Sequence, residues 1–271
     1  MIKNHHTKYL LLLKTMIALN IILFSVSLIL SGKSLKLSIN PFTALSPSTG
    51  ILISLGATGN FAVNKYSGQL GHKFTGQTES QSNGTLTRHF ISNYWWAVTL
   101  ISANWLHGSL LHVLFNMIAL FQIGSLVSVI YGMHRMFIIY TLSGIIGFYL
   151  SCLAGVSVTI GASAAICGLL GSAFYFGRSQ KETPGGKAVA RMTSGWILSL
   201  VIFGFAIPNI NNWGHGGGFT AGILLGWLLG YSKVGYAQNI KESRFNAPLS
   251  FMLMLVTILG LVLPFILLFL F

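Results

Sequence analysis

The stretch "GASAAICGLLG", residues 161–171, places one serine among small residues at the point where an apolar helix is predicted to begin. Ala164, Gly168 and Ser172 recur every four positions, so they share one face of that helix. A face of small residues allows two membrane helices to approach closely. Ser163 therefore has two candidate roles, in helix packing or as a nucleophile, and the rest of the chain must decide between them.

The composition of the chain indicates a polytopic membrane protein. Of its 271 residues, 53% are hydrophobic and only 7% are charged, whereas soluble proteins carry about 25% charged residues. The net charge of +13 would suit a nucleic acid, but the basic residues lie in short loops between apolar runs, where they set the orientation of a membrane protein. We therefore expect a lipid bilayer as partner, and no nucleic acid.

Seven apolar runs are predicted to form membrane helices, which gives an all-α fold with seven spans. A signal peptide is the competing interpretation of the first run, but the run is too long and no small-residue cleavage site follows it. Lysines and arginines favour alternate loops, which predicts a cytoplasmic N-terminus. The predicted helices cover residues 9–30, 110–131, 136–153, 163–176, 195–207, 216–230 and 249–271.

These runs divide the chain into four predicted segments. Residues 1–31 form a cytoplasmic tail and the first helix, and residues 32–106 form an extracytoplasmic first loop with a polar insertion. Residues 107–234 form the transmembrane core that holds the candidate site. Residues 235–271 form a linker and an additional C-terminal helix.

The acidic residues exclude several kinds of membrane enzyme. The chain has no aspartate, and its three glutamates, Glu79, Glu182 and Glu242, all lie in polar segments. An intramembrane carboxylate relay, an aspartyl protease dyad and a His-Glu-x-x-His zinc motif are therefore excluded. The two cysteines, Cys152 and Cys167, show no metal-binding spacing. We predict no metal site and no cofactor.

Two predicted helices are too short to cross a bilayer. The run from Ser163 covers about 14 residues, or about 21 Å at 1.5 Å per residue, against about 30 Å of hydrocarbon. The run from residue 216 has the same shortage. Backbone that is not helical at this depth must be buried in protein or line a wet cavity. The lengths therefore predict a water-filled pocket with Ser163 and His215 at its floor.

The polar residues of the core gather near the same end of these helices. His112 and Asn116 are four residues apart and share a helical face, while His107 lies at the preceding junction. Each of these side chains, like Ser163 and His215, could simply bond a neighbouring helix. Their convergence at one depth favours a functional site instead.

A second set of small residues explains how Ser163 and His215 would meet. Gly218, Gly222, Gly226 and Gly230 recur every four residues, as the small residues after Ser163 do. Two such faces pack closely against each other. If they pack together, the helices that begin near Ser163 and His215 bring these two side chains together.

Three motifs carry a resemblance to a known family. "HGSLLHVLFN", "GASAAICGLLG" and "HGGGFTAG" resemble, in order, the signatures of the rhomboid intramembrane serine proteases. The resemblance implies a rhomboid-like core of six helices plus one C-terminal span. The sequence departs from the family pattern at Ala97 and Cys167, where an arginine and an aromatic residue are usual.

The resemblance also implies a role for each candidate residue. Ser163 would be the nucleophile and His215 its general base. His112 and Asn116, with the Ser163 backbone N–H, would form the oxyanion hole. The supporting residues would be His107 and Gly161, and the helix-packing glycines Gly168, Gly218 and Gly222.

These observations predict an intramembrane serine endopeptidase that cleaves single-span membrane proteins. Because the chain has no aspartate, a Ser–His dyad is the form of serine catalysis left open. A bacterial inner membrane is the expected location, and the sequence does not indicate an oligomeric state. One alternative is a catalytically inactive rhomboid-like factor that binds membrane proteins. Another is a transporter or channel, which the lack of intramembrane charges and of visible repeats disfavours.

Overall fold

The computed structural model describes the whole chain except residues 1, 41, 61–95, 208–209, 232–244 and 271. Among the described residues, seven long helices and no named strands are present. Short elements, α2 (Thr49–Ser54) and the 3-10 turns η1 (Gly32–Ser34) and η2 (Ala103–Trp105), lie in the connection after the first helix. The long helices are α1 (Ile2–Ser31), α6 (Leu110–Tyr131), α7 (Met133–Leu153), α8 (Ser163–Ser179), α9 (Pro184–Ala206), α10 (Asn212–Leu229) and α11 (Asn246–Leu270).

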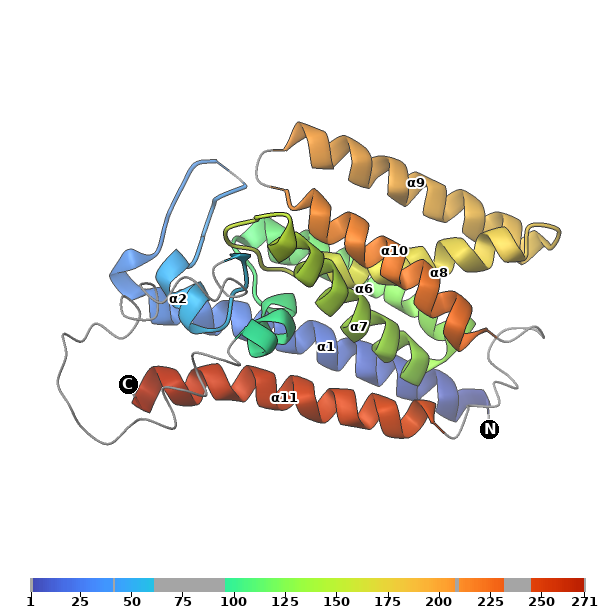
Figure 1. Cartoon of the computed structure of the whole chain (residues 1–271), viewed down its shortest axis with the longest axis horizontal. Coiled ribbons are helices and arrows are strands. Elements are labelled where there is room, and N and C mark those ends of the chain that lie inside the picture. The colour runs from blue at the N-terminus through green and yellow to red at the C-terminus, as the bar shows by residue number, and fades with distance from the viewer. Residues whose placement is uncertain (1, 41, 61–95, 208–209, 232–244, 271) are drawn as a thin grey trace.

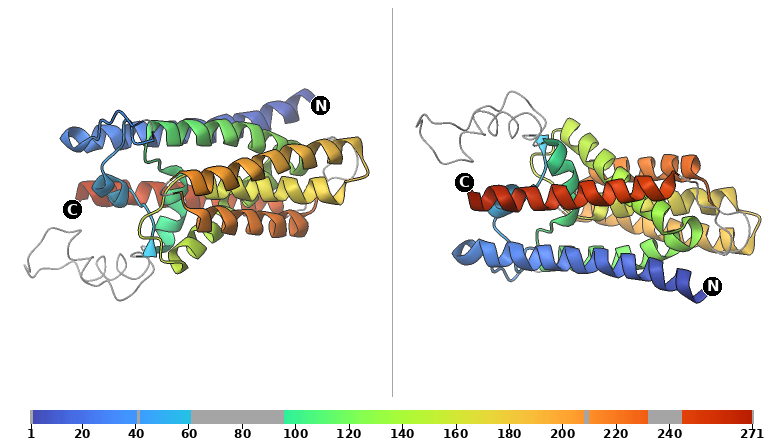
Figure 2. Two further views of the ribbon diagram at one scale, coloured as in Figure 1. Left: turned by 90° about the horizontal axis from the view of Figure 1, so that it is seen from above. Right: turned by 90° about the horizontal axis from the view of Figure 1, so that it is seen from below.

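The long helices run side by side along the long axis of the molecule (Figure 1 and Figure 2). Helix α8 lies at the centre, because it packs against α6, α7, α9 and α10. Helix α1 packs mainly on α6, and α11 packs on α7. We call the end of the bundle at which α8 begins the Ser163 end; it is the left-hand end in Figure 1, where the C-terminus also lies.

The protein is an all-α, multi-pass integral membrane protein. Five helical stretches are long and apolar enough to cross a membrane: Leu10–Ser34, Leu110–Tyr131, Met133–Leu153, Pro184–Ala206 and Asn246–Phe269. Helices α8 and α10, with 17 and 18 residues, do not meet this length and composition requirement. These are the two helices that the sequence predicts to be short.

Five predicted helix starts are wrong. Helices α1, α7 and α11 begin three to seven residues earlier than predicted, at Ile2, Met133 and Asn246, and the other two starts, those of α9 and α10, have a clear physical reason. Helix α9 begins at Pro184 rather than Gly195, because Thr183 caps it by accepting a hydrogen bond from the Gly186 N–H at 3.0 Å. Its first turns are too polar to be recognised as part of an apolar run. Helix α10 begins at Asn212 rather than Gly216, because Asn211 caps it in the same way. His215 therefore lies in the first turn of α10 and not before it.

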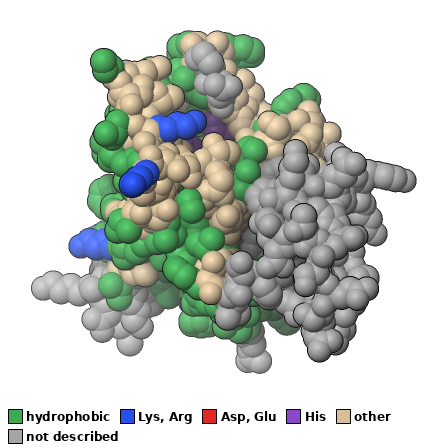
Figure 3. Space-filling model, turned by 90° about the vertical axis from the view of Figure 1, so that its left-hand side faces the viewer, with side chains coloured by type: hydrophobic (Ala, Val, Ile, Leu, Met, Phe, Trp, Pro, Cys, Tyr) green, Lys and Arg blue, Asp and Glu red, His purple; other side chains and the backbone are tan. Residues whose placement is uncertain are grey.

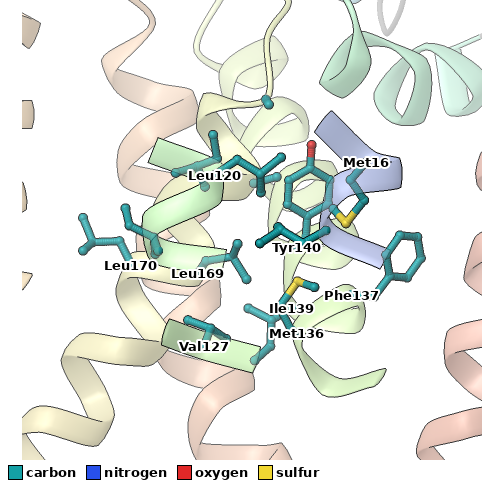
Figure 4. Close-up of a cluster of buried hydrophobic side chains, with 14 of the residues drawn as sticks. Met16, Leu120, Val127, Met136, Phe137, Ile139, Tyr140, Leu169 and Leu170 are labelled. Atoms are coloured by element: carbon teal, nitrogen blue, oxygen red, sulfur yellow. The ribbon is translucent and has the colours of Figure 1, made fainter. Parts of the chain in front are cut away.

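The apolar core lies between the central helices and α1. Tyr140 of α7 is almost fully buried, with Met16 of α1 beside its ring (Figure 4). Trp105 of η2 packs edge-on against the same ring, at a centroid distance of 5.6 Å. Burial of such large side chains joins α1 and η2 to the central helices. The other labelled members of this core are Leu120, Val127, Met136, Phe137, Ile139, Leu169 and Leu170.

Helices α8 and α10 approach each other most closely at small residues. A Cβ added to Gly222 would lie 2.6 Å from the Gly168 Cα, and one added to Gly226 would lie 3.1 Å from the Ser172 Cα. One added to Gly218 would collide with the Ala164 carbonyl. The backbones are therefore as close as helix packing permits. We call these six residues the small-residue interface: Ala164, Gly168 and Ser172 of α8, and Gly218, Gly222 and Gly226 of α10.

Candidate active site

Ser163 and His215 form a hydrogen-bonded pair at the Ser163 end of the bundle. The His215 Nε2 lies 2.8 Å from the Ser163 Oγ, which is the separation expected between a nucleophile and its general base. Ser163 is the first residue of α8, and His215 occupies the first turn of α10. Both side chains are half-buried, so they are within reach of water without lying on the surface.

The close approach of the two helices places this pair. The small-residue interface begins one residue after Ser163 and three residues after His215. A third helix contributes Gly147 of α7, where an added Cβ would lie 2.6 Å from the Gly214 carbonyl oxygen and 3.2 Å from the Ala164 Cβ. The Ser163 and His215 side chains therefore start from backbones that three helices hold together.

The start of α8 offers backbone hydrogen-bond donors at Ser163. Ala162 precedes the helix and provides no side-chain cap. The first N–H groups of any helix have no partner within the helix, and the dipole adds positive potential there. Ser163 is thus at a position where a developing negative charge would be stabilised.

His112 lies against the backbone of Gly161, two residues before Ser163. A Cβ added to Gly161 would lie only 2.6 Å from the His112 Nε2. The backbone φ of Gly161 is +118°, a value that residues other than glycine rarely adopt. Both observations require glycine at this position. The Gly161 N–H donates to the Ala103 carbonyl at 2.8 Å, which fixes the loop that carries it.

The other candidates lie next to His112. The Asn116 side chain is buried one turn further along α6, and its Nδ2 donates to the His112 carbonyl at 2.8 Å. His107 is fully buried, with its ring 5.0 Å from that of His112. Burial, together with the nearby His112, lowers the pKa of His107 well below its ordinary value, so the His107 imidazole is neutral at pH 7.

The site opens toward the Ser163 end of the molecule. Figure 3 views this end and shows a histidine surface at the bottom of a hollow, with a lysine or arginine side chain at its edge. A hollow at this place agrees with the half-buried state of Ser163 and His215.

Several residues around the pair were not anticipated from the sequence. Asn211, Thr159 and Ser151 form a hydrogen-bonded group beside the pair, and Gly147 underlies it. Asparagine is a common helix cap, so the two asparagines before "WGH" could have identified Asn211 as the cap of α10. The contacts of Thr159 and Ser151 join distant segments and leave no local pattern.

The geometry defines a class of protein: a multi-pass helical membrane protein with a serine–histidine pair at the start of two closely packed helices. The sequence profile described as "Rhomboid domain" matches residues 92–232, which is more than half of the chain. The chain belongs to the rhomboid family.

Similar proteins occur in plants and bacteria. The chain is 38% identical to RHOMBOID-like protein 5 of Arabidopsis thaliana, over 54% of this chain and 52% of that protein. It is 35% identical to Rhomboid protease GluP of Bacillus subtilis, over 52% of this chain and 27% of that protein. RHOMBOID-like protein 1 of A. thaliana is 35% identical over 55% of this chain and 39% of that protein. The chain thus spans about half or less of the length of these relatives.

Proposed function

We propose that this protein is an intramembrane serine endopeptidase that cleaves membrane-protein substrates with a Ser–His dyad. The observation that carries the proposal is the 2.8 Å contact between the Ser163 Oγ and the His215 Nε2 within a bundle of apolar helices. Membership of the rhomboid family supports it, as does the name of the relative called Rhomboid protease GluP.

In this mechanism, His215 acts first as base and then as acid. Its Nε2 takes the Ser163 hydroxyl proton while the Oγ attacks the scissile carbonyl carbon, and the proton then passes to the leaving amine. The peptide C–N bond breaks, and an acyl ester remains on Ser163. Water, deprotonated by the same nitrogen, hydrolyses the ester and restores the hydroxyl. The His215 Nδ1 is buried with no hydrogen-bond partner among the described residues, which favours a dyad over a carboxylate triad.

The oxyanion would be stabilised by three donors. The His112 Nδ1 accepts a hydrogen bond from the Gly108 N–H at 3.4 Å, so the neutral ring carries its proton on Nε2, beside Gly161. Asn116 has a second amide hydrogen besides the one given to the His112 carbonyl. The backbone N–H of Ser163 is the third donor.

Replacing Asn116 with alanine is expected to lower kcat by about 10²-fold, since loss of one oxyanion donor has an effect of this size. KM should change little, because the interaction strengthens only in the transition state. The measurement is cleavage of a reporter transmembrane substrate in liposomes. A kcat within twofold of wild type would remove Asn116 from the oxyanion hole.

The substrates would be single-span membrane proteins cut in or beside the membrane segment. Helix α9 offers the route for their lateral entry. It packs mainly against α8, and only 17% of the residues in its most apolar stretch are buried. By resemblance to the family, the cut would follow a small residue in an unstable helix. We propose a bacterial cell membrane as the location, which the Bacillus subtilis relatives support.

Labelling by a fluorophosphonate probe tests the proposed function without any knowledge of the substrate. The purified protein in detergent is expected to form one covalent adduct, and the Ser163→Ala variant to form none. An inactive membrane-protein binding factor, or a transporter, would not be labelled. Wild-type protein that is folded but neither labelled nor able to cleave a reporter would overturn the proposal.

A further inference from the structure

We propose that Asn211 and Thr159 form a cross-link that sets the position of His215 relative to Ser163, so that both are positioning residues for catalysis. This inference rests on the proposed function. Its basis is one hydrogen bond, from the Asn211 Nδ2 to the Thr159 Oγ1 at 2.7 Å. Neither residue touches the reacting atoms, so the argument concerns how the two helix starts are held.

The two residues occupy equivalent places in the chain. Thr159 lies four residues before Ser163, and Asn211 lies four residues before His215. The Asn211 carbonyl accepts the His215 backbone N–H at 3.1 Å, so a shift of Asn211 is passed directly to the base. We call the Asn211–Thr159 bond the brace, because it joins the residue that precedes α10 to the segment that leads into α8.

Both polar atoms of the Asn211 side chain form hydrogen bonds in this arrangement. Its Oδ1 accepts the Gly214 N–H at 2.9 Å and so caps α10. Its amide nitrogen donates one hydrogen to Thr159 and the other to the Ser151 Oγ at the end of α7. One side chain thus joins the start of α10, the end of α7 and the segment that leads into α8.

Thr159 in turn is fixed by the connection that follows α1. Its N–H donates to the Thr58 carbonyl at 2.7 Å, and its carbonyl accepts the Thr58 N–H at 3.2 Å. The neighbouring Val156 carbonyl accepts the Asn60 N–H at 2.8 Å. The segment before the nucleophile is therefore held on one side by this connection and on the other by Asn211. Thr159 is the residue at which these two supports meet.

A purely structural role for Asn211, as a helix cap, is the competing explanation. Serine caps helices about as well as asparagine but is too short to reach Thr159. The Asn211→Ser variant therefore keeps the cap and removes the brace. Thr159→Val removes the same hydrogen bond from the other side at nearly constant volume, and Thr159→Ser retains the hydroxyl.

The test measures kcat, KM and the fluorophosphonate labelling rate of the purified full-length protein, together with its thermal unfolding midpoint. Asn211→Ser and Thr159→Val are each expected to lower kcat and the labelling rate by about 10-fold to 100-fold, the loss that a misplacement of about 1 Å produces. KM should stay within about twofold. Thr159→Ser should restore most of the rate, and Thr220→Val, which removes an exposed hydroxyl from α10, is the matched control.

The double variant decides whether the two residues act through one bond. Because Asn211→Ser already removes the bond that Thr159→Val removes, the variant that carries both substitutions should lose no more rate than Asn211→Ser alone. Losses that multiply would overturn the inference, as would single variants with wild-type kcat or rates that fall only in parallel with stability. Wild-type labelling that depends on Ser163 is measured alongside, so that a failure of the brace is distinguished from a failure of the proposed function.

Discussion

Replacing His215 with glutamine is expected to reduce kcat for a transmembrane reporter by at least about 10⁴-fold, because a serine hydroxyl without a base is a poor nucleophile. The fold should survive, since the His215 ring is half-buried and its Nδ1 has no hydrogen-bond partner among the described residues. The measurement is single-turnover cleavage in liposomes, with the unfolding midpoint as the check on folding.

This prediction has two controls, the Ser163→Ala variant and the double variant that carries both Ser163→Ala and His215→Gln. Residues that act as one catalytic unit are strongly non-additive. Ser163→Ala alone should reduce cleavage to background, and adding His215→Gln should lower it no further. If His215→Gln retained a tenth of the wild-type kcat, another group would have to be the base.

Replacing Gly222 with leucine is expected to destabilise the protein and abolish activity together. A Cβ at this position would lie 2.5 Å from the Gly168 carbonyl carbon and 2.6 Å from its Cα. Backbone atoms cannot move aside as a flexible side chain would, so α8 and α10 must separate. Overpacking of this kind costs about 3 kcal/mol or more, and separated helices would draw His215 away from Ser163.

The matched control is Gly195→Leu on α9, where an added Cβ would meet nothing within 4 Å. Its unfolding midpoint should stay near that of the wild type, whereas Gly222→Leu should unfold several degrees lower. A Gly222→Leu protein with wild-type stability and activity would show that the small-residue interface does not hold the pair together.

Much of the fold could be predicted because a bilayer imposes strong rules on sequence. The run at 110–131 was predicted with the bounds of α6, and the shortness of α8 and α10 followed from their apolar lengths. The recurrence of Gly218, Gly222 and Gly226 pointed to a close helix contact, and these residues do face Ala164, Gly168 and Ser172. Periodicity and length are local signals, so they can be read from one sequence.

The remaining features depend on contacts between distant segments. The start of α9 was missed because Thr183 and Pro184 begin the helix in polar sequence. Thr159 has no pattern around it that predicts a bond to Asn211, which is 52 residues away. Cys167 is almost fully buried, which agrees with a small packing residue on α8. The predicted polar insertion, residues 64–88, lies wholly within residues 61–95, which are outside the described residues.

The helices of the bundle are not held equally: α8 and α10 pack closely against each other, whereas α9 is loosely packed. Ser163 and His215 lie on α8 and α10, whose backbones touch along three pairs of small residues. Helix α9 packs chiefly against α8 and presents most of its apolar surface outward. For the proposed protease, substitutions on α9 can therefore change which substrates enter without moving the contact between Ser163 and His215. New substrate preferences could thus arise from substitutions on α9 alone, while the Ser163–His215 pair is kept.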